Sequence, residues 1–378
     1  MTPFRWTAEH LARIGSPAAR AAPLIDPRHA PRVGSDFDLW DHWPALTTDG
    51  RLAEVAGGLL VIALTAPVLP DPEARHAVAR LRLFHRTPER FVDLGPLLPD
   101  GFSPGSREWA GSALFDAADR TLTLYFTAAG ERGEPTPSFE QRMFACSATL
   151  GDDLRPRGWS EPEELVRPDG AVYETDMAGG GAVGTIKAFR DPYFFRDPAG
   201  SGDRLLFAAS RAGADSAWNG LVGAARGKGD GWRLETPWVD ATGVNNELER
   251  PHAIAHDDRV YLFWSTQAKV FAPGTPPAPT GLYGVVADRI GAPWRPLNGD
   301  ALVFANPPEA PAQAYSWQVL PDLSVWGFAD LVGLPRPPVD ADEARRHFAG
   351  APAPVLRLEL RDDEARLSGD HMARAHSI

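Results

Sequence analysis

Two glutamates separated by one apolar residue, Glu247 and Glu249, stand directly before Arg250 and a strand-forming run. In an extended segment side chains alternate between faces, so the two carboxyl groups point the same way and Leu248 points the other way. Crowding of like charges raises the pKa of a carboxyl group, which would let one of them hold a proton near neutral pH. The pair is a candidate for general acid chemistry, although a solvated strand end carrying surface charge would show the same pattern.

Related groups occur at two distant places in the chain. Asp41 directly follows Trp40, and Asp191 directly follows Arg190. A retaining glycosidase needs a carboxylate nucleophile and a carboxylic acid about 5–5.5 Å apart, and a third acid can bind sugar hydroxyls more strongly in the transition state. We assign the acid/base role to Glu249 and the nucleophile role to Asp41, and Arg190 can form forked hydrogen bonds to hydroxyls or to the second glutamate. Acids before strands are also common as caps and in salt bridges, so the assignment requires that the three acids meet.

The elements that would position these acids are strand pairs of one repeated plan. Each pair begins with polar or aromatic residues, forms a strand, turns on Asp, Gly or Pro, and forms an apolar second strand. Four pairs span residues 108–127, 190–209, 249–264 and 315–328, and the apolar run GGLLVIALTAP after Asp41 belongs to another. The spacing exceeds the roughly 40–50 residues of blade-type repeats, so long loops must be inserted.

Five such units predict an all-β protein, a five-bladed β-propeller with a central axial pocket, in which the acids occupy equivalent positions of the blades. A β-sandwich with the same number of strands is the competing fold, but it gives no reason for reactive groups to recur at the same position of each strand pair. No linker separates two halves, so we expect residues 1–378 to form a single propeller domain. We also expect a short helix over residues 7–14 and a charged tail from Asp362 that is helical or frayed.

Composition limits the classes of partner. The net charge of −12 argues against nucleic acid, and 36 Gly and 37 Pro imply many turns. Cys146 is the only cysteine, which excludes an intrachain disulfide and a thiolate metal cluster, and it is expected to be an inert thiol in a buried strand. The N-terminus lacks the apolar run of a signal peptide and nothing reaches the length of a membrane span. We therefore expect a cytoplasmic protein with no membrane partner, unless it leaves the cell by a route that needs no signal.

Five segments in order resemble the motifs of the levansucrase/inulosucrase family, glycoside hydrolase family 68: LWDHWP (39–44), EWAGSA (108–113), FRDP (189–192), NELERPH (246–252) and QAYS (313–316). The likeness runs from about Trp6 to Leu360. It implies a five-bladed propeller that cleaves sucrose through a covalent β-fructosyl-enzyme. By motif, Asp41 would be the nucleophile, Asp191 the transition-state stabiliser and Glu249 the acid/base.

The same resemblance implies the sugar subsites. Trp40, Trp109, Arg190 and Glu247 would shape the places for fructose and glucose, with Tyr315 close to the catalytic acids.

Three positions depart from the family pattern. Ala110 stands where a serine usually steadies the attacking carboxylate. Asn246 stands where many members use an acid to bind calcium, so we expect no metal, and no cofactor is implied. Gln267 aligns with a basic residue that helps to hold the acceptor sugar.

Because Gln267 lacks charge, we expect weaker control of chain growth, with substantial hydrolysis and short fructo-oligosaccharides instead of long levan. Two other functions remain open. One is a propeller glycosidase acting on another furanoside, such as a fructan or an arabinan. The other is a carbohydrate-binding propeller that has lost catalysis, which the loss of a hydroxyl at Ala110 would allow.

Overall fold

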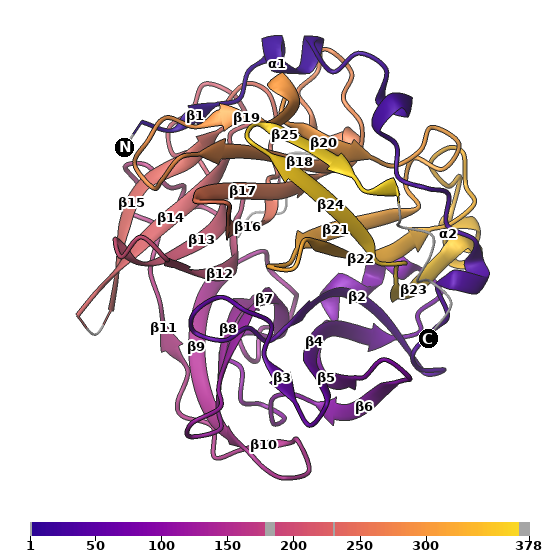
Figure 1. The fold of residues 1–378 in the computed structure, drawn as a ribbon. Coiled ribbons are helices and arrows are strands. Elements are labelled where there is room, and N and C mark those ends of the chain that lie inside the picture. The colour runs from indigo at the N-terminus through magenta and orange to yellow at the C-terminus, as the bar shows by residue number, and fades with distance from the viewer. Residues whose placement is uncertain (1, 178–185, 230, 370–378) are drawn as a thin grey trace.

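Five separate sheets form the molecule. The computed structural model describes residues 2–177, 186–229 and 231–369. The sheets follow one another in chain order around a ring, and the first strand of each sheet lies nearest the centre (Figure 1). The predicted five-bladed β-propeller is therefore confirmed, and the β-sandwich is excluded.

The sheets share one plan of four strands in sequence and one added strand. The first sheet contains β2 (Phe37–Pro44), β4 (Gly58–Pro67), β5 (Arg80–Arg86) and β6 (Phe91–Pro96), with β3 (Glu54–Val55) paired to β4. The second contains β7 (Arg107–Asp116), β8 (Thr121–Ala129), β9 (Gln141–Leu150) and β10 (Pro156–Arg157), with β11 (Glu163–Glu164) paired to β9. The third contains β12 (Phe189–Asp197), β13 (Gly202–Ser210), β14 (Gly220–Lys228) and β15 (Gly231–Asp240), with β1 (Phe4–Arg5) paired to β15.

The fourth sheet contains β16 (Glu249–His256), β17 (Arg259–Thr266), β18 (Gly281–Ala287) and β19 (Arg295–Pro296), with β20 (Leu302–Ala305) paired to β18. The fifth contains β21 (Ala314–Val319), β22 (Ser324–Leu331), β24 (Leu356–Arg361) and β25 (Glu364–Leu367), with β23 (Phe348–Pro352) paired to β22. The helices are α1 (Ala8–Ala12), α2 (Ala341–His347) and the 3-10 turns η1 (Pro17–Arg20), η2 (Pro27–His29), η3 (Pro72–Ala77), η4 (Ala268–Val270) and η5 (Leu297–Gly299).

The innermost strands contact one another in chain order, and the ring closes where β2 meets β22 and β23. The four predicted strand pairs correspond to β7–β8, β12–β13, β16–β17 and β21–β22, and the apolar run after Asp41 is β4. Apolar side chains on facing sheets pack into the core between blades, where Trp43, Trp264 and Trp317 are almost fully buried. Cys146 is a buried free thiol on β9, as expected.

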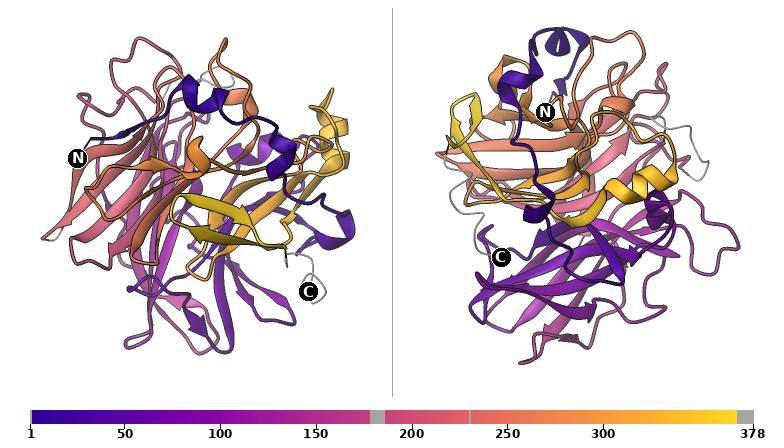
Figure 2. Two further views of the ribbon diagram at one scale, coloured as in Figure 1. Left: turned by 45° about the horizontal axis from the view of Figure 1, so that its top comes forward. Right: turned by 90° about the vertical axis from the view of Figure 1, so that its right-hand side faces the viewer.

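The N-terminal segment crosses three blades before it enters the first one (Figure 2). β1 extends the third sheet by parallel pairing with β15. Ala21 then forms a bridge to Ala305 of the fourth sheet, and the backbone N–H of Ile25 donates to Gln313 Oε1 beside the fifth. The predicted helix is confirmed as α1. Through these contacts the N-terminal segment connects the third, fourth and fifth blades.

The described part of the C-terminal tail differs from the prediction. Instead of a helix or a frayed end from Asp362, residues Glu364–Leu367 form β25, antiparallel to β24; residues 370–378, to which the prediction also applied, lie outside the described residues. The Asn298 side chain holds this strand by exchanging two hydrogen bonds with the backbone of Ala365, of 2.9 and 3.0 Å. A contact between residues 67 positions apart, as between Asn298 and Ala365, cannot be recognised in a short charged sequence. Among the described residues, no helix is long and apolar enough to cross a membrane.

Candidate active site

Each innermost strand has an irregularity at the same place in its pairing with the next strand. The paired residues on either side are Leu39 and His42, Trp109 and Gly111, Arg190 and Tyr193, Glu249 and His252, and Tyr315 and Gln318. A bulge of this kind bends the strand and re-aims its side chains. Three residues in the bulges have left-handed backbones, with φ of 63° at Asp191, 47° at Arg250 and 59° at Ser316. Each such non-glycine conformation costs on the order of 1 kcal/mol, so strain is concentrated where the strands meet.

The three predicted acids occupy successive positions of this bulge, one on each of three strands. Glu249 is the last paired residue before the bulge, Asp191 is the first unpaired residue, and Asp41 is the second. The expectation of equivalent blade positions is therefore wrong by one or two residues. The bulge breaks the alternation of side chains, so different positions on different blades can face the same point.

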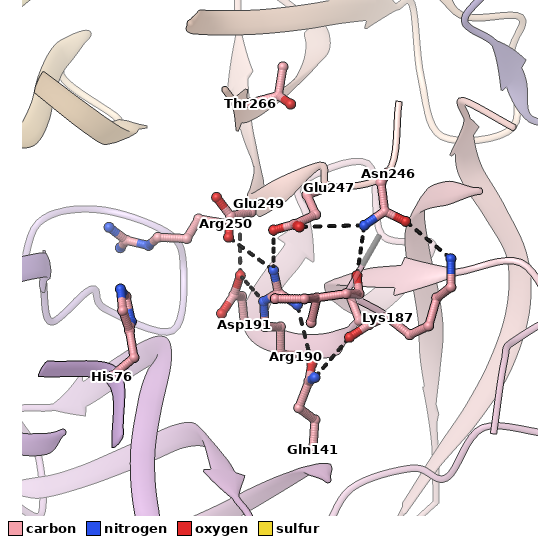
Figure 3. Close-up of polar contacts among 12 residues, drawn as sticks. His76, Gln141, Lys187, Arg190, Asp191, Asn246, Glu247, Glu249, Arg250 and Thr266 are labelled. Atoms are coloured by element: carbon pink, nitrogen blue, oxygen red, sulfur yellow. Dashed lines mark hydrogen bonds and ion pairs between the residues drawn. The ribbon is translucent and has the colours of Figure 1, made fainter. Parts of the chain in front are cut away.

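On one side of the site, the acid side, Arg190 contacts both Glu247 and Glu249 (Figure 3). Its Nη2 donates to Glu247 Oε2 at 3.0 Å and to Glu249 Oε1 at 2.9 Å. The Tyr315 hydroxyl donates a short hydrogen bond to Glu249 Oε2. The side chains of Glu249 and Glu247 remain 21% and 13% exposed, so both carboxyl groups keep access to solvent.

Charge crowding acts on Glu247. Burial and the neighbouring charge of Glu249 raise the pKa of Glu247 to about 7, although Arg190 opposes the rise. The sequence interpretation assigned the proton-holding role to Glu249 alone. In the structure, the raised pKa belongs to Glu247, which lies beside Glu249 and contacts the same arginine.

On the opposite side, Asp41 lies close to the Arg250 guanidinium and the Ser316 hydroxyl. Burial raises the pKa of Asp41, whereas Arg250 and Ser316 lower it. The guanidinium lies 5.3 Å from the centre of the Trp43 ring. It donates to four neutral oxygens: Ser316 O (3.2 Å), Ser316 Oγ (3.1 Å), His42 O (3.3 Å) and Gln318 Oε1 (3.0 Å).

Asp191 lies between these two sides. Its backbone N–H donates to Thr127 Oγ1 at 2.9 Å, and its Oδ2 accepts from the backbone N–H of Arg250 at 3.1 Å. Burial raises the pKa of Asp191 to about 6; Arg190 opposes this, and the charges of Glu249 and Asp41 add to it. The charge of Glu249 acts on Asp41 and on Asp191, and that of Asp41 acts on Asp191, so the structure brings the three acids close together.

Two tryptophans and an unpredicted histidine lie beside the acids. Trp40 is buried, whereas Trp109 is partly exposed and its Nε1 donates to the carbonyl oxygen of His76 at 3.2 Å. The His76 ring lies 5.9 Å from the Trp40 ring and projects from η3 toward Asp191 and Arg250 (Figure 3). Sequence reasoning missed His76 because it belongs to an insertion between β4 and β5 and to no motif. It also left Arg250 without a role, although the residue directly follows Glu249.

Ala110 and Gln267 are two of the departures from the family pattern, and the structure shows what surrounds each of them. Ala110 is buried on β7 and its carbonyl oxygen accepts from Thr127 Oγ1 at 3.0 Å. A hydroxyl near Asp41 comes instead from Ser316, on another blade. Gln267 precedes η4, and within the described residues no hydrogen bond links its side chain to the acids. Its role with an acceptor sugar stays a prediction.

Asn246 lies in a corner that does not fit calcium. Its Oδ1 accepts from the Lys187 ammonium at 3.3 Å, so a cationic side chain already faces this oxygen. Calcium prefers several oxygen ligands that include carboxylates. Over the described ranges, no group of three or more His, Cys, Asp or Glu residues could hold a metal ion.

Known proteins resemble this chain in sequence and in fold. A family model described as Levansucrase/Invertase matches residues 1–219 and 207–372. A levansucrase of Pseudomonas syringae pv. actinidiae is 29% identical over 385 residues, covering 89% of this chain and 85% of that protein. A levansucrase of Rahnella aquatilis is 27% identical over 409 residues, covering 96% of this chain and 94% of that protein. The structure of an inulosucrase from Halalkalicoccus jeotgali bound to kestose matches with a TM-score of 0.88 and 38% identity, covering 97% of this chain and 96% of that chain.

Proposed function

The chain belongs to the Levansucrase/Invertase family, and on that premise we propose that it is a retaining enzyme that cleaves sucrose and transfers the fructosyl group. Levansucrases and an inulosucrase are among its relatives. The observation that carries the proposal is the convergence of Asp41, Asp191 and Glu249, with their two arginines, on the innermost strands. Three acids around one point, two of them on either side of a scissile bond, suit glycosyl transfer with retention.

In the first step, an Asp41 oxygen attacks the anomeric carbon of the fructosyl group and the glycosidic bond breaks. Glu249 gives a proton to the departing glucose oxygen. Glu247, whose pKa is raised to about 7, contacts the same Arg190 Nη2 as Glu249. Asp191 accepts hydrogen bonds from fructosyl hydroxyls, which strengthen as positive charge develops on the ring.

In the second step, water or a sugar hydroxyl attacks the anomeric carbon of the fructosyl-Asp41 ester, the bond from that carbon to Asp41 breaks and frees the carboxylate, and Glu249 removes the proton of the attacking hydroxyl. Water is always abundant, so transfer requires an acceptor held in attack geometry, and each tenfold preference needs about 1.4 kcal/mol. The uncharged Gln267 supplies only a weak grip on an acceptor. We therefore propose a mixture of hydrolysis and short fructo-oligosaccharides, with little long polymer.

Incubation with sucrose tests the proposal through the amounts of glucose and fructose released. Equal amounts indicate hydrolysis, and a fructose deficit measures transfer. Asp41→Ala should abolish glucose release and retain the circular dichroism spectrum of the wild type. Absence of glucose release from the wild type would overturn the proposal; turnover of a fructan or arabinan would then favour another furanosidase, and sugar binding without turnover would favour a binding propeller.

A further inference from the structure

Lys187 is an unusual residue at the edge of the site. The chain has 38 lysines and arginines, of which only three are lysines: 187, 228 and 269. The Lys187 ammonium donates to Ala217 O at 2.5 Å, to Asn219 Oδ1 at 2.6 Å and to Asn246 Oδ1 at 3.3 Å. An ammonium group has three N–H donors, so all of them are directed at protein oxygens. The bulky planar guanidinium of arginine could not replace this compact group.

The two amides that receive Lys187 are themselves held in place. Asn219 Nδ2 donates to Arg211 O at 2.7 Å, and Asn246 Nδ2 donates to Ile186 O at 2.7 Å. Asn219 is 4% exposed and Asn246 is fully buried, so both amides depend mainly on protein partners. Turning either amide over would direct its N–H groups at the ammonium. Lys187 and the carbonyl oxygen of Ile186 thereby determine together which atom of Asn246 faces the catalytic acids.

The contacts continue from Asn246 into the catalytic centre (Figure 3). Asn246 Nδ2 lies 3.4 Å from Glu247 Oε1, and the other oxygen of that carboxyl group accepts from Arg190. The same arginine nitrogen donates to Glu249. A continuous chain of polar contacts therefore runs from Lys187 to the proposed acid/base.

We propose that Lys187 is a positioning residue, which orients the Asn246 amide so that Glu247 and Arg190 keep the geometry that the acid/base requires. The inference rests on the proposed function, because it assigns Glu247 and Glu249 their roles in sucrose cleavage. The Lys187 ammonium thus orients the Asn246 amide from within the protein. Without it, Asn246 loses the partner of its Oδ1 and is held only through Nδ2, so its contact with Glu247 Oε1 is less firmly positioned.

The charged groups that act on Glu247 are Glu249, Arg190 and Lys269, together with Lys187 itself. Lys187 could influence Glu247 directly through its charge or indirectly through the Asn246 amide. The hydrogen bond from Asn246 lowers the pKa of Glu247. Losing it raises that pKa, so Glu247 would keep its proton to higher pH.

A double-mutant cycle separates the two routes. We would compare Lys187→Met, Asn246→Ala and the double variant with the wild type, using Lys228→Met at the exposed end of β14 as the matched control. Lys187→Met should lower kcat/KM for glucose release about tenfold and move the basic limb of its pH profile to higher pH. In the Asn246→Ala background, the same substitution should change kcat/KM by less than about twofold. Lys228→Met should match the wild type.

Two results would overturn the inference: unchanged kcat/KM in Lys187→Met, or an equally large effect of that substitution in the Asn246→Ala background. The second result would mean that the lysine acts by charge alone. Failure of the wild type to release glucose would instead overturn the proposed function. Thermal unfolding of the same variants would still test the coupling between Lys187 and Asn246, because it needs no substrate; independent effects on Tm would contradict it.

Discussion

The two arginines of the catalytic centre carry the same charge but are held in opposite ways. Arg250 donates to neutral oxygens, chiefly backbone carbonyl, hydroxyl and amide groups, whereas Arg190 donates to the carboxylates of Glu247 and Glu249. Burial lowers the pKa of Arg250. Burial also acts to lower the pKa of Arg190, but Glu247 and Glu249 outweigh it and raise that pKa.

This difference separates two uses of a buried cation. Arg250 has no direct carboxylate partner on its guanidinium within the described residues, so its charge acts on Asp41 and Asp191. The Arg190 guanidinium instead contacts two carboxyl groups, those of Glu247 and Glu249, at hydrogen-bonding distance. We interpret Arg250 as a fixed source of positive potential for the nucleophile and Arg190 as a clamp that positions the acid pair and binds sugar.

Replacing Arg250 with methionine should have the largest effect. It removes the cation that lowers the pKa of Asp41, and it leaves buried oxygens on β2 and β21 without their donor. We expect kcat for glucose release to fall about 10²–10³-fold, as when one preorganised electrostatic group is removed. The acid limb of the kcat/KM profile should move to higher pH, because carboxyl groups that lose a cationic neighbour ionise at higher pH.

Arg250→Lys is the matched control for that prediction. It retains the charge but loses the fork of donors, so it should keep more activity and shift the acid limb less. Circular dichroism would verify folding of both variants. Equal losses without any shift of the limb would mean that Arg250 contributes hydrogen bonds only.

Replacing Arg190 with methionine should have a smaller effect of a different kind. The variant loses the clamp between Glu247 and Glu249 and the proposed contacts with sugar hydroxyls. We expect kcat/KM to fall about 10- to 100-fold, mainly through a higher KM. Steady-state kinetics of glucose release measures this split, and a loss confined to kcat would contradict the assignment of Arg190 as the substrate clamp.

Glu247→Gln tests, in the absence of substrate, how the raised pKa of Glu247 affects the free energy of unfolding. The pKa of Glu247 is raised from 4.5 to about 7 in the folded protein. Below 4.5 both folded and unfolded states are protonated, so the substitution should change stability little. As pH rises through the folded pKa, the wild type loses stability because its unfolded state ionises more readily. Above about 7, the variant should be more stable by up to about 3 kcal/mol.

Urea unfolding over a range of pH measures that difference in the free energy of unfolding. A difference that does not change with pH would show that Glu247 is not the group that titrates.

Gln267→Arg should have the smallest effect. A positive side chain near the acceptor should favour transfer over hydrolysis by about 3- to 10-fold, equivalent to at most about 1.4 kcal/mol. The ratio of free fructose to free glucose measures the change, with Gln267→Ala as the control that removes the amide. An unchanged ratio in both variants would place the acceptor away from this residue.

The sequence predicted the ring of blades and the three acids because both depend on local patterns. Hairpins with Asp, Gly or Pro turns reveal strand pairs, and short motifs mark Asp41, Asp191 and Glu249. The offset of these acids within the bulges could not be predicted, since a bulge depends on pairing with the neighbouring strand.

Other features were hidden for the same physical reason. The pairing of β1 with β15 joins segments that are more than two hundred residues apart, and β25 forms from a charged stretch without a strand pattern. His76 and Lys187 lie outside the motifs, and their relevance depends on tertiary contacts with Trp109 and Asn246. Ala110 led us to expect that no hydroxyl would steady Asp41, and the sequence did not reveal that Ser316 of the fifth blade supplies one.

Peptide mapping after rapid acid quench tests most directly whether Asp41 is the attacking carboxylate of this three-acid centre. The wild type would be mixed with sucrose, quenched during the first turnovers, digested and analysed by mass spectrometry. The account predicts one added fructosyl group on the peptide that contains Asp41, and none in Asp41→Asn. Release of glucose with the fructosyl group attached to any other peptide, or with none on that peptide, would contradict it.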